Sequence, residues 1–390
     1  MSETSRTASS AACLECPDCG QTFDDRWRCT CASPLRFADR PMPDGRPPEV
    51  GALDSRAGLW TFERFLPVGN ASSDRVTLGE GMTPLVSADA ERAASETDEG
   101  WNAAFKLEYV FPTGSFKDRG AATTLTRAVE LGVERVVEDS SGNAGAAIAT
   151  YAARAGIDTE VYVPVDAKPS KLQAIQRAGA TPVRIEGSRA DVTDACVAAV
   201  AGGDDDTPAW YASHAWNPAF FEGTATVAYE LAYQRDWEAP DAIVTPLGHG
   251  TLFLGAYWGF RRLRRAGWID ELPRLYGAQA AGVAPVVDAL HGPAASDPSG
   301  TRNDAADGIQ IEAPVRIDGI REAIADTGGD AVAITETAVT RELERLHAAG
   351  FYTEPTCAVA PAALRELRER GAIDADEDVV VPLTGSGLKT

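Results

Sequence analysis

One lysine stands where its chemistry would be unusual. Lys117 lies in the stretch FPTGSFKDRG, between a strand-like and a helical segment, in a chain with only five lysines. We expect Ser115 to cap that helix, with Asp118 three residues on as a short capping box. Lys117 would then lie in the first helical turn, where the macrodipole favours a neutral amine. A neutral amine can form a Schiff base with an aldehyde, although most single lysines are surface residues.

Three further segments offer polar groups where a strand ends and a helix begins. In DSSGNAG, backbone N–H groups and Asn143 could hold a carboxylate or a phenolic oxygen. In TPLGHGTL, Gly248 and Gly250 could form a phosphate cradle, although a short G-x-G is often only a tight turn. In VPLTGSGLKT, the Thr384 hydroxyl could face a heteroaromatic nitrogen or simply cap the strand. With Lys117, these groups predict a site for an aldehyde cofactor that carries a phosphate.

The elements that must position these groups follow an alternating pattern. From about residue 100, short apolar strands alternate with amphipathic helices, which predicts an α/β fold with two doubly wound parallel-sheet domains. In such folds the loops at the carboxyl ends of the strands build the active site. We expect a large domain from residues 46–120 and 216–390, and a smaller α/β domain with the SGN loop from residues 121–215.

Cysteines are concentrated at the start of the chain, in residues 1–45, which we expect to form a zinc-ribbon-like extension and a proline-rich linker. Five of the seven cysteines lie between residues 13 and 31. The turn C-P-D-C-G is followed by a second pair spaced as C-x-C. The predicted tetrahedral zinc ligands are Cys16, Cys19, Cys29 and Cys31. Cys13 competes as a ligand, and a disordered tail with spare thiols is the alternative.

The charge of the chain excludes two classes of partner. Fifty-eight acidic residues against 36 basic ones give a net charge of −22, with acidic loops such as ASETDEG and GGDDDTP. Nucleic acids and anionic membranes need a positive surface, so we expect neither as a partner. The absence of a long apolar run and of a signal-like start predicts a cytoplasmic protein. The dispersed acidity suggests a salt-adapted protein from a halophile.

The order of the motifs resembles a known family. GEGMTPL, PTGSFKDRG, SSGN, the G-x-G cradle, EPT and TGSGLK resemble the threonine synthase family, among the fold-type II, tryptophan synthase β-like, pyridoxal-phosphate enzymes. The resemblance implies that Lys117 binds the cofactor aldehyde, that Asn143 contacts the pyridoxal ring oxygen and that Thr384 meets the pyridine nitrogen. The residues that it places at the cofactor phosphate are Gly248, His249, Gly250 and Thr251.

The resemblance also implies a reaction. Threonine synthases convert O-phospho-L-homoserine and water into L-threonine and phosphate. In this chain Lys117 would serve as general base and acid. Ser140, Ser141 and Gly142 would bind the substrate carboxylate at a helix N-terminus. Active sites of this type often occur in dimers, so a homodimer is expected.

Three regions depart from the family pattern near the substrate phosphate. Ala144 follows the SGN asparagine where a hydroxyl residue is common, and Ser386 stands where histidine is frequent. Phe220 and Phe221 occupy the region that usually holds an arginine. A dianionic phosphate needs charge-assisted donors. Four basic residues could compensate, and the sequence does not show which of them face inward: Lys106, Lys168, Lys171 and Arg119.

These departures keep other interpretations open. Arg119 is more readily a structural partner of Asp118 or of the sheet. His249 is expected to shape the cradle loop, and His214 to line the substrate side. An alternative function is a pyridoxal-phosphate enzyme of the serine/threonine ammonia-lyase type, with β-elimination or β-replacement on a non-phosphorylated amino acid. A third is a catalytically silent scaffold or zinc-dependent binding protein, against which the intact Lys117 argues.

Overall fold

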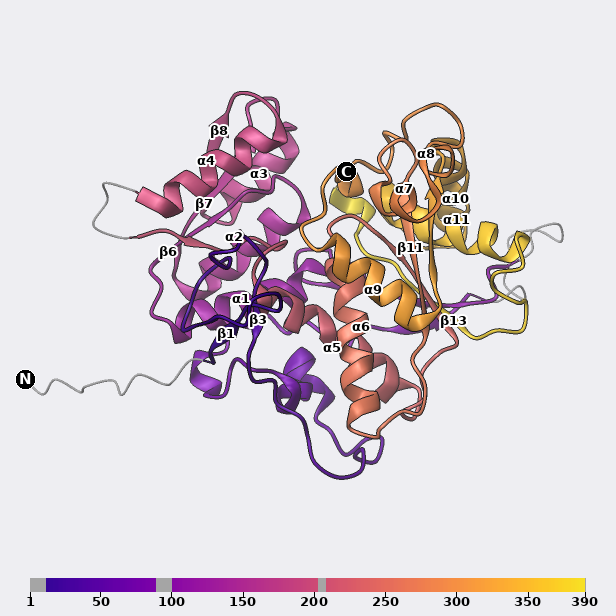
Figure 1. The fold of residues 1–390 in the computed structure, drawn as a ribbon, viewed down its shortest axis with the longest axis horizontal. Helices are drawn as coiled ribbons and strands as arrows, with labels where there is room; N and C mark the ends of the chain where they lie inside the picture. The colour runs from indigo at the N-terminus through magenta and orange to yellow at the C-terminus, as the bar shows by residue number, and fades with distance from the viewer. Residues whose placement is uncertain (1–11, 89–99, 203–207, 390) are drawn as a thin grey trace, which may run out of the picture.

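The computed structural model describes residues 12–88, 100–202 and 208–389. The acidic segments ASETDEG and GGDDDTP fall almost wholly outside these residues. The described chain forms a six-stranded sheet, a four-stranded sheet and a small N-terminal sheet, and helices flank the two larger ones (Figure 1). In that view the four-stranded sheet lies at the upper left and the six-stranded sheet at the right.

The larger sheet has the strand order β12-β11-β10-β13-β5-β4. Neighbouring strands are parallel except for β4 and β5, which pair antiparallel. The strands are β4 (Leu85–Ser87), β5 (Ala104–Lys106), β10 (Ala242–Pro246), β11 (Arg274–Ala280), β12 (Asp330–Ile334) and β13 (Val379–Pro382). The central strands are buried on both faces, which explains their continuous apolar sequences.

The smaller sheet has the order β8-β7-β6-β9, and all of its pairs are parallel. Its strands are β6 (Arg135–Glu138), β7 (Asp158–Pro164), β8 (Thr181–Ile185) and β9 (Trp210–Tyr211). The helices that follow the first three strands are α2 (Asn143–Ala155), α3 (Pro169–Arg177) and α4 (Arg189–Gly202). This alternation confirms the prediction of an α/β fold with parallel sheets.

The remaining helices belong to the larger sheet and its surroundings. They are α1 (Lys117–Glu130), α5 (Pro218–Gln234), α6 (Thr251–Arg265), α7 (Pro285–His291), α8 (Pro293–Ser296), α9 (Ile317–Thr327), α10 (Glu336–Ala348) and α11 (Pro355–Glu369). The 3₁₀ segments of the described residues are η1 (Ser55–Phe65), η2 (Ser72–Asp74), η4 (Glu108–Val110), η5 (Asp307–Ile309) and η6 (Gly387–Lys389).

Helix α5 is buried along almost its full length, packed against α1 and α6. Such close helix packing depends on two glycines. A Cβ on Gly223 would lie 2.1 Å from the Arg119 carbonyl oxygen, and one on Gly255 would lie 2.3 Å from Thr224 Oγ1. Helix α1 begins with Lys117, so this packing fixes the position of the lysine.

The predicted helix cap at Ser115 and capping box at Asp118 were wrong. Ser115 does not cap α1, because the N-cap is Phe116 and no side chain caps the first turn. Asp118 instead accepts a hydrogen bond from Thr113 N at 2.8 Å and another from the Thr113 hydroxyl, so its carboxylate stabilises the Thr-Gly-Ser turn. The strand before this turn is short, because β5 ends at Lys106 and the 3₁₀ turn η4 follows.

The proline-rich linker is attached to the larger sheet's helices. The carbonyl oxygens of Gly45 and Pro48 accept hydrogen bonds from the indoles of Trp268 and Trp237, at 2.9 and 2.8 Å. Gly51 N donates to the Tyr233 hydroxyl at 2.9 Å. Tyr233 of α5, with Trp237 and Trp268 just beyond the ends of α5 and α6, therefore holds the segment that joins the cysteine-rich start to the rest of the chain.

Candidate active site

The loops after β6, β10 and β13 meet at one cavity of about 150 Å³. Its walls include all the residues that the sequence analysis assigned to cofactor or substrate: Lys117, Ser140, Ser141, Gly142, Asn143, Gly248, His249, Gly250, Thr251 and Thr384. The carboxyl ends of β10 and β13 in the larger sheet and of β6 in the smaller sheet all contribute to this cavity, as expected for ligand sites of α/β folds. The structure brings these residues together, and their individual roles remain predictions.

Lys117 is the first residue of α1, and its Nζ lies 3.1 Å from Thr251 Oγ1. The side chain is half-buried and opens onto the cavity. Its Nζ also lies 4.7 Å from the centre of the Phe116 ring. The pKa of Lys117 is lowered to about 7, chiefly by burial; the charges of Glu138 and Glu354 raise it, and the charge of Arg189 lowers it. A neutral amine was expected from the helix dipole, but burial is the largest cause.

The C-terminal segment is joined directly to the lysine loop. Phe116 N donates to the Thr384 carbonyl oxygen at 3.1 Å, and Ser115 forms an antiparallel bridge with Gly385. The Thr384 hydroxyl lies 3.4 Å from the Cys357 sulfur at the start of α11. Main-chain bonding thus fixes Thr384 beside Lys117, which the motif TGSGLK alone could not show.

The Gly-His-Gly turn leads into α6, whose first turn has no side-chain cap. Gly250 is its N-cap with φ 77°, and no side chain bonds to the first turn. A Cβ there would lie 2.7 Å from Ile320 Cδ1, so only glycine fits. First-turn N–H groups without a side-chain cap are available to an anion. His249 lies in this turn with its Nδ1 buried and unpaired, and burial lowers its pKa to about 3.

The SGN loop contacts the EPT motif across the cavity. Asn143 Nδ2 lies 3.0 and 3.2 Å from the two carboxylate oxygens of Glu354. Burial raises the pKa of Glu354, and Lys389 opposes this change. The sequence analysis used EPT only as a family marker and missed this carboxylate as a wall of the site. Its position directly before α11, as the N-cap residue, gave no signal of the contact.

His214, which lines the cavity, forms a buried acid–base pair with Glu138. His214 Nδ1 is 2.8 Å from Glu138 Oε1, and the His214 ring centre is 5.3 Å from that of His249. Burial raises the pKa of Glu138 well above its ordinary value and lowers that of His214 well below its own. The prediction that His214 lines the cavity is confirmed. The sequence analysis did not assign Glu138 to the site, because nothing in the sequence distinguishes it from the last residue of an ordinary strand.

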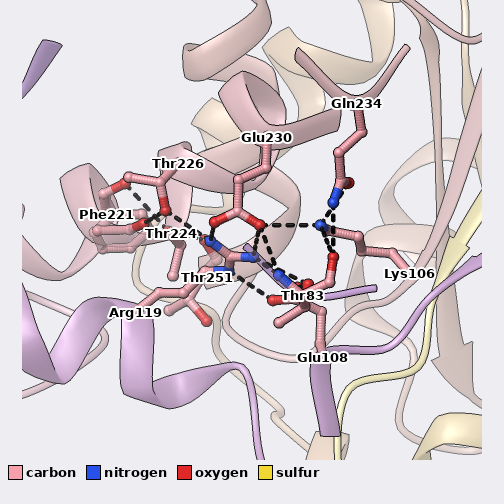
Figure 2. Close-up of polar contacts among 11 residues, drawn as sticks. Thr83, Lys106, Glu108, Arg119, Phe221, Thr224, Thr226, Glu230, Gln234 and Thr251 are labelled. Atoms are coloured by element: carbon pink, nitrogen blue, oxygen red, sulfur yellow. Dashed lines mark hydrogen bonds and ion pairs between the residues drawn. The ribbon is translucent and has the colours of Figure 1, made fainter. Parts of the chain in front are cut away.

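Two of the four basic residues considered for the substrate phosphate are buried elsewhere (Figure 2). Arg119 Nε lies 2.7 Å from Glu108 Oε2, and its Nη1 lies 2.5 Å from Glu230 Oε1. Its partners are therefore these two glutamates and not Asp118, which the sequence suggested as one possibility. Lys106 Nζ lies 2.9 Å from Glu230. All four side chains are fully buried. They form a neutral cluster, which we call the core charge cluster, and none of them lines the cavity.

Phe220 confirms that the chain is apolar where the family pattern has an arginine. Its side chain is fully buried and lies under Gly120 at the start of α1. The Lys117 Nζ is 5.7 Å from the ring centre, and the His214 ring is 5.9 Å from it. Phe221 instead packs against Arg316, whose guanidinium carbon lies 4.5 Å from the centre of the Phe221 ring. Phe220 therefore packs against Lys117 at the start of α1.

The predicted zinc ligands also lie together. The sulfur atoms of Cys16, Cys19, Cys29 and Cys31 all lie within 4.8 Å of one another, and none forms a disulfide. They are held by the small sheet β2-β1-β3, with β1 (Leu14–Glu15), β2 (Thr22–Phe23) and β3 (Arg36–Phe37). Cys13 is exposed and lies outside this group.

Comparisons with known proteins agree with the geometry. A family model described as pyridoxal-phosphate dependent enzyme matches residues 76–385. The processed form of threonine deaminase isoform 2 from Solanum lycopersicum superposes with a TM-score of 0.63 at 18% identity, covering 88% of this chain and 95% of that one. At that identity the likeness concerns the fold, which is that of an α/β pyridoxal-phosphate enzyme.

Closer relatives define the group. A threonine synthase of Methanocaldococcus jannaschii is 34% identical over 383 residues, which cover 96% of this chain and 92% of the relative. One from Methanosarcina acetivorans is 36% identical over 339 residues, with 85% and 80% covered. The chain belongs to the threonine synthase family of pyridoxal-phosphate-dependent enzymes, as predicted. Among the described residues, no helix is both long and apolar enough to cross a membrane.

Proposed function

We propose that this chain is a threonine synthase that converts O-phospho-L-homoserine and water into L-threonine and phosphate. The observation that carries the proposal is the Lys117 amine, with a pKa of about 7, facing a cavity whose walls include two helix N-termini. The threonine synthases that it resembles over most of its length support the same reaction.

The residues present fit pyridoxal phosphate. The glycine-capped first turn of α6 leaves N–H groups for its phosphate, and Lys117 faces the same cavity to bind its aldehyde. Asn143 would contact the ring oxygen and Thr384 the ring nitrogen. A hydroxyl, unlike a carboxylate, leaves that nitrogen largely unprotonated. When bound, the cofactor supplies the electron sink for chemistry at the substrate's Cα.

The chain's own residues would bind the substrate and move its protons. Ser140, Ser141 and Gly142 precede α2 and would hold the substrate carboxylate at that helix N-terminus. The Lys117 amine would accept a proton from Cα and carry protons to and from Cβ. A pKa near 7 suits both directions of transfer, because the amine is then neither a strong base nor a permanent cation.

The experiment is product analysis with the purified protein, pyridoxal phosphate and O-phospho-L-homoserine in high KCl. Equal amounts of L-threonine and phosphate are expected. The alternative is an ammonia-lyase type of activity, favoured by the apolar Ala144 and Phe220. It would instead give 2-oxobutanoate and ammonia from L-threonine, with no L-threonine formed from the phosphorylated substrate. That result would replace the proposed function.

We also propose that the four clustered cysteines hold a structural zinc ion. A tetrahedral site with Zn–S bonds of ~2.3 Å requires sulfur atoms about 3.8 Å apart. The Cys16–Cys31, Cys19–Cys29 and Cys19–Cys31 pairs lie at 3.6, 3.4 and 3.8 Å. Metal analysis should find one zinc per chain, and Cys16→Ser should lose it. One zinc retained in that variant would contradict the assignment.

Several features of the whole protein are further proposals. We infer that residues 46–120 and 216–390 form the cofactor-binding domain and residues 121–215 a smaller α/β domain that carries the SGN loop. The boundary at residue 120 falls within α1, which is continuous from Lys117 to Glu130. We also infer a halophilic protein, from the net charge of −22, a cytoplasmic one, from a sequence without a long apolar run, and a homodimer, from the family resemblance. Thermal unfolding at rising KCl tests the salt adaptation, and greatest stability in dilute buffer would contradict it. Light scattering tests the dimer.

A further inference from the structure

The proposed substrate brings a phosphate of its own, separate from the cofactor's. Two positions where the family pattern has phosphate donors offer none here: Ala144 lines the cavity with a methyl group, and Phe220 is fully buried and does not line it. Lys106 and Arg119 are committed to the core charge cluster. Lys168 is 71% exposed and does not line the cavity. Lys171 is therefore the one residue of the four considered from sequence that does.

A second cation, Arg189, lines the cavity and was not foreseen from the sequence. Its position is fixed by the start of α4, where Ser188 N donates to Asp191 Oδ2 at 2.6 Å and Asp191 N donates to Ser188 Oγ at 3.3 Å. This reciprocal capping box holds the first turn. Thr193 Oγ1 donates to Asp139 Oδ2 at 2.6 Å, which joins α4 to the loop before Ser140.

Arg189 is an exposed residue that forms part of the cavity wall. Its charge helps to lower the pKa values of Lys117, His214 and His249, each of which faces the same space. Within the described residues, no ion pair or hydrogen bond neutralises Arg189. An arginine that faces a cavity without a partner is suited to bind phosphate, because its planar donors match two phosphate oxygens at once.

Lys171 lines the cavity from α3, a helix that follows a strand of the four-stranded sheet, as α4 does. It is the third residue of α3, and its Nζ lies 3.3 Å from Asp307 Oδ2 on the opposite wall. The Asp307 side chain is 46% exposed, so this ion pair is weak and open to exchange. A phosphate dianion entering between the walls can take the place of the Asp307 carboxylate.

We propose that Arg189 and Lys171 bind the phosphate group of the substrate and set the preference for a phosphorylated amino acid. This inference rests on the proposed function, since it names how that substrate is recognised. One cation each from α3 and α4 would replace the donors missing at Ala144 and Phe220. Their charges balance a dianion locally, in a protein whose net charge of −22 would otherwise repel it.

The test compares Arg189→Gln and Lys171→Gln with a matched control, Lys168→Gln. Lys168 pairs with the same Asp307, at 3.5 Å, but does not line the cavity. Losing one charge-assisted contact should raise KM for O-phospho-L-homoserine roughly tenfold to a hundredfold, with kcat changed less. Arg189→Lys should recover part of the loss. The control should match the wild type, and the visible absorbance of bound cofactor should be the same in every variant.

Binding of inorganic phosphate separates this inference from the proposed function. Calorimetry on the cofactor-loaded protein should show phosphate binding that weakens in Arg189→Gln and Lys171→Gln but not in Lys168→Gln. If the wild type forms no L-threonine yet shows this pattern, the proposed reaction fails and the anion site stands. If the wild type forms L-threonine while both variants keep its KM and its phosphate affinity, the inference is overturned.

Discussion

Two lysines on neighbouring segments, Lys106 and Lys117, differ in what surrounds them. Lys106 Nζ is fully buried and bonds to Glu230, to the Thr83 carbonyl and to Gln234 at 2.9, 2.7 and 2.8 Å. Lys117 Nζ has one hydrogen bond, to a hydroxyl, and opens onto a cavity. Burial lowers the pKa of both. Only Lys106 has three acceptors that hold its position.

The same contrast extends to the groups around each lysine. In the core charge cluster, two cations and two carboxylates neutralise each other, with Arg119 between Glu108 and Glu230 (Figure 2). Although burial opposes it, the charges of Arg119 and Lys106 lower the pKa of Glu230 to about 2. Buried charges require such pairing because their desolvation is costly. The cavity instead keeps cations without full pairing, which is the arrangement that binding anions needs.

The largest expected effect comes from Lys117→Ala. This change should remove the visible absorbance of the cofactor and lower kcat by at least about a thousandfold, because the acid–base group is lost. The fold should stay intact, since Lys117 makes a single hydrogen bond. Absorbance and circular dichroism on one sample check both claims. An unchanged visible spectrum would overturn the assignment of the lysine.

The next effect concerns stability rather than chemistry. Arg119→Met leaves Glu108 buried without its cation, and removing one partner of a buried pair costs about 3–5 kcal/mol. Urea unfolding of the larger domain should show this loss. The double variant Arg119→Met with Glu108→Gln should recover part of it, because the unpaired charge is gone. No recovery would mean that Arg119 stabilises the fold through packing.

Lys106→Met should have a smaller effect. Glu230 keeps Arg119 as its partner, and the Thr83 carbonyl keeps the Gln234 amide at 2.9 Å. The expected cost is therefore about 1–3 kcal/mol, that of incompletely paired buried acceptors. Cofactor absorbance and KM should equal those of the wild type. A loss of cofactor binding in this variant would remove the distinction between the two lysines.

Sequence patterns identified the elements that carry strong local signals. The strands β6, β10 and β13 are short apolar runs followed by glycine-rich turns, and each could be placed from the sequence. Strand β12, with the sequence DAVAI, was missed because alanine weakens a strand signal. The cap at Ser115 was wrong since Asp118 is taken by the preceding turn. Local rules do not anticipate such competition between nearby donors.

The site was predictable only where function constrains the backbone. Lys117, Asn143 and the glycines of the cradle lie at strand–helix junctions, so residue type and position agreed. Arg189 and Glu354 gave no comparable signal, because their importance arises from contacts between segments far apart in sequence. Partners in the core charge cluster also come from separate elements. Whether a cation is paired is a tertiary property, and it decides which cations bind ligands.

The smallest effect is a pH dependence that reads the Lys117 environment directly. Only the neutral amine attacks an aldehyde, so the rate of cofactor uptake by cofactor-free protein should rise with pH and level off above about 7. An ordinary lysine would continue to rise to about pH 10.4. Between these values the unfolded chain holds a proton that the folded one lacks, so this group makes the cofactor-free protein more stable as pH rises. Stopped-flow absorbance gives the uptake rate.

In Arg189→Gln the midpoint of this pH dependence should move to higher pH, since a neighbouring positive charge is removed. In Lys106→Met the midpoint should not move. A midpoint near pH 10 in the wild type would mean that the Lys117 amine is solvated, and that burial lowers the pKa of Lys106 alone.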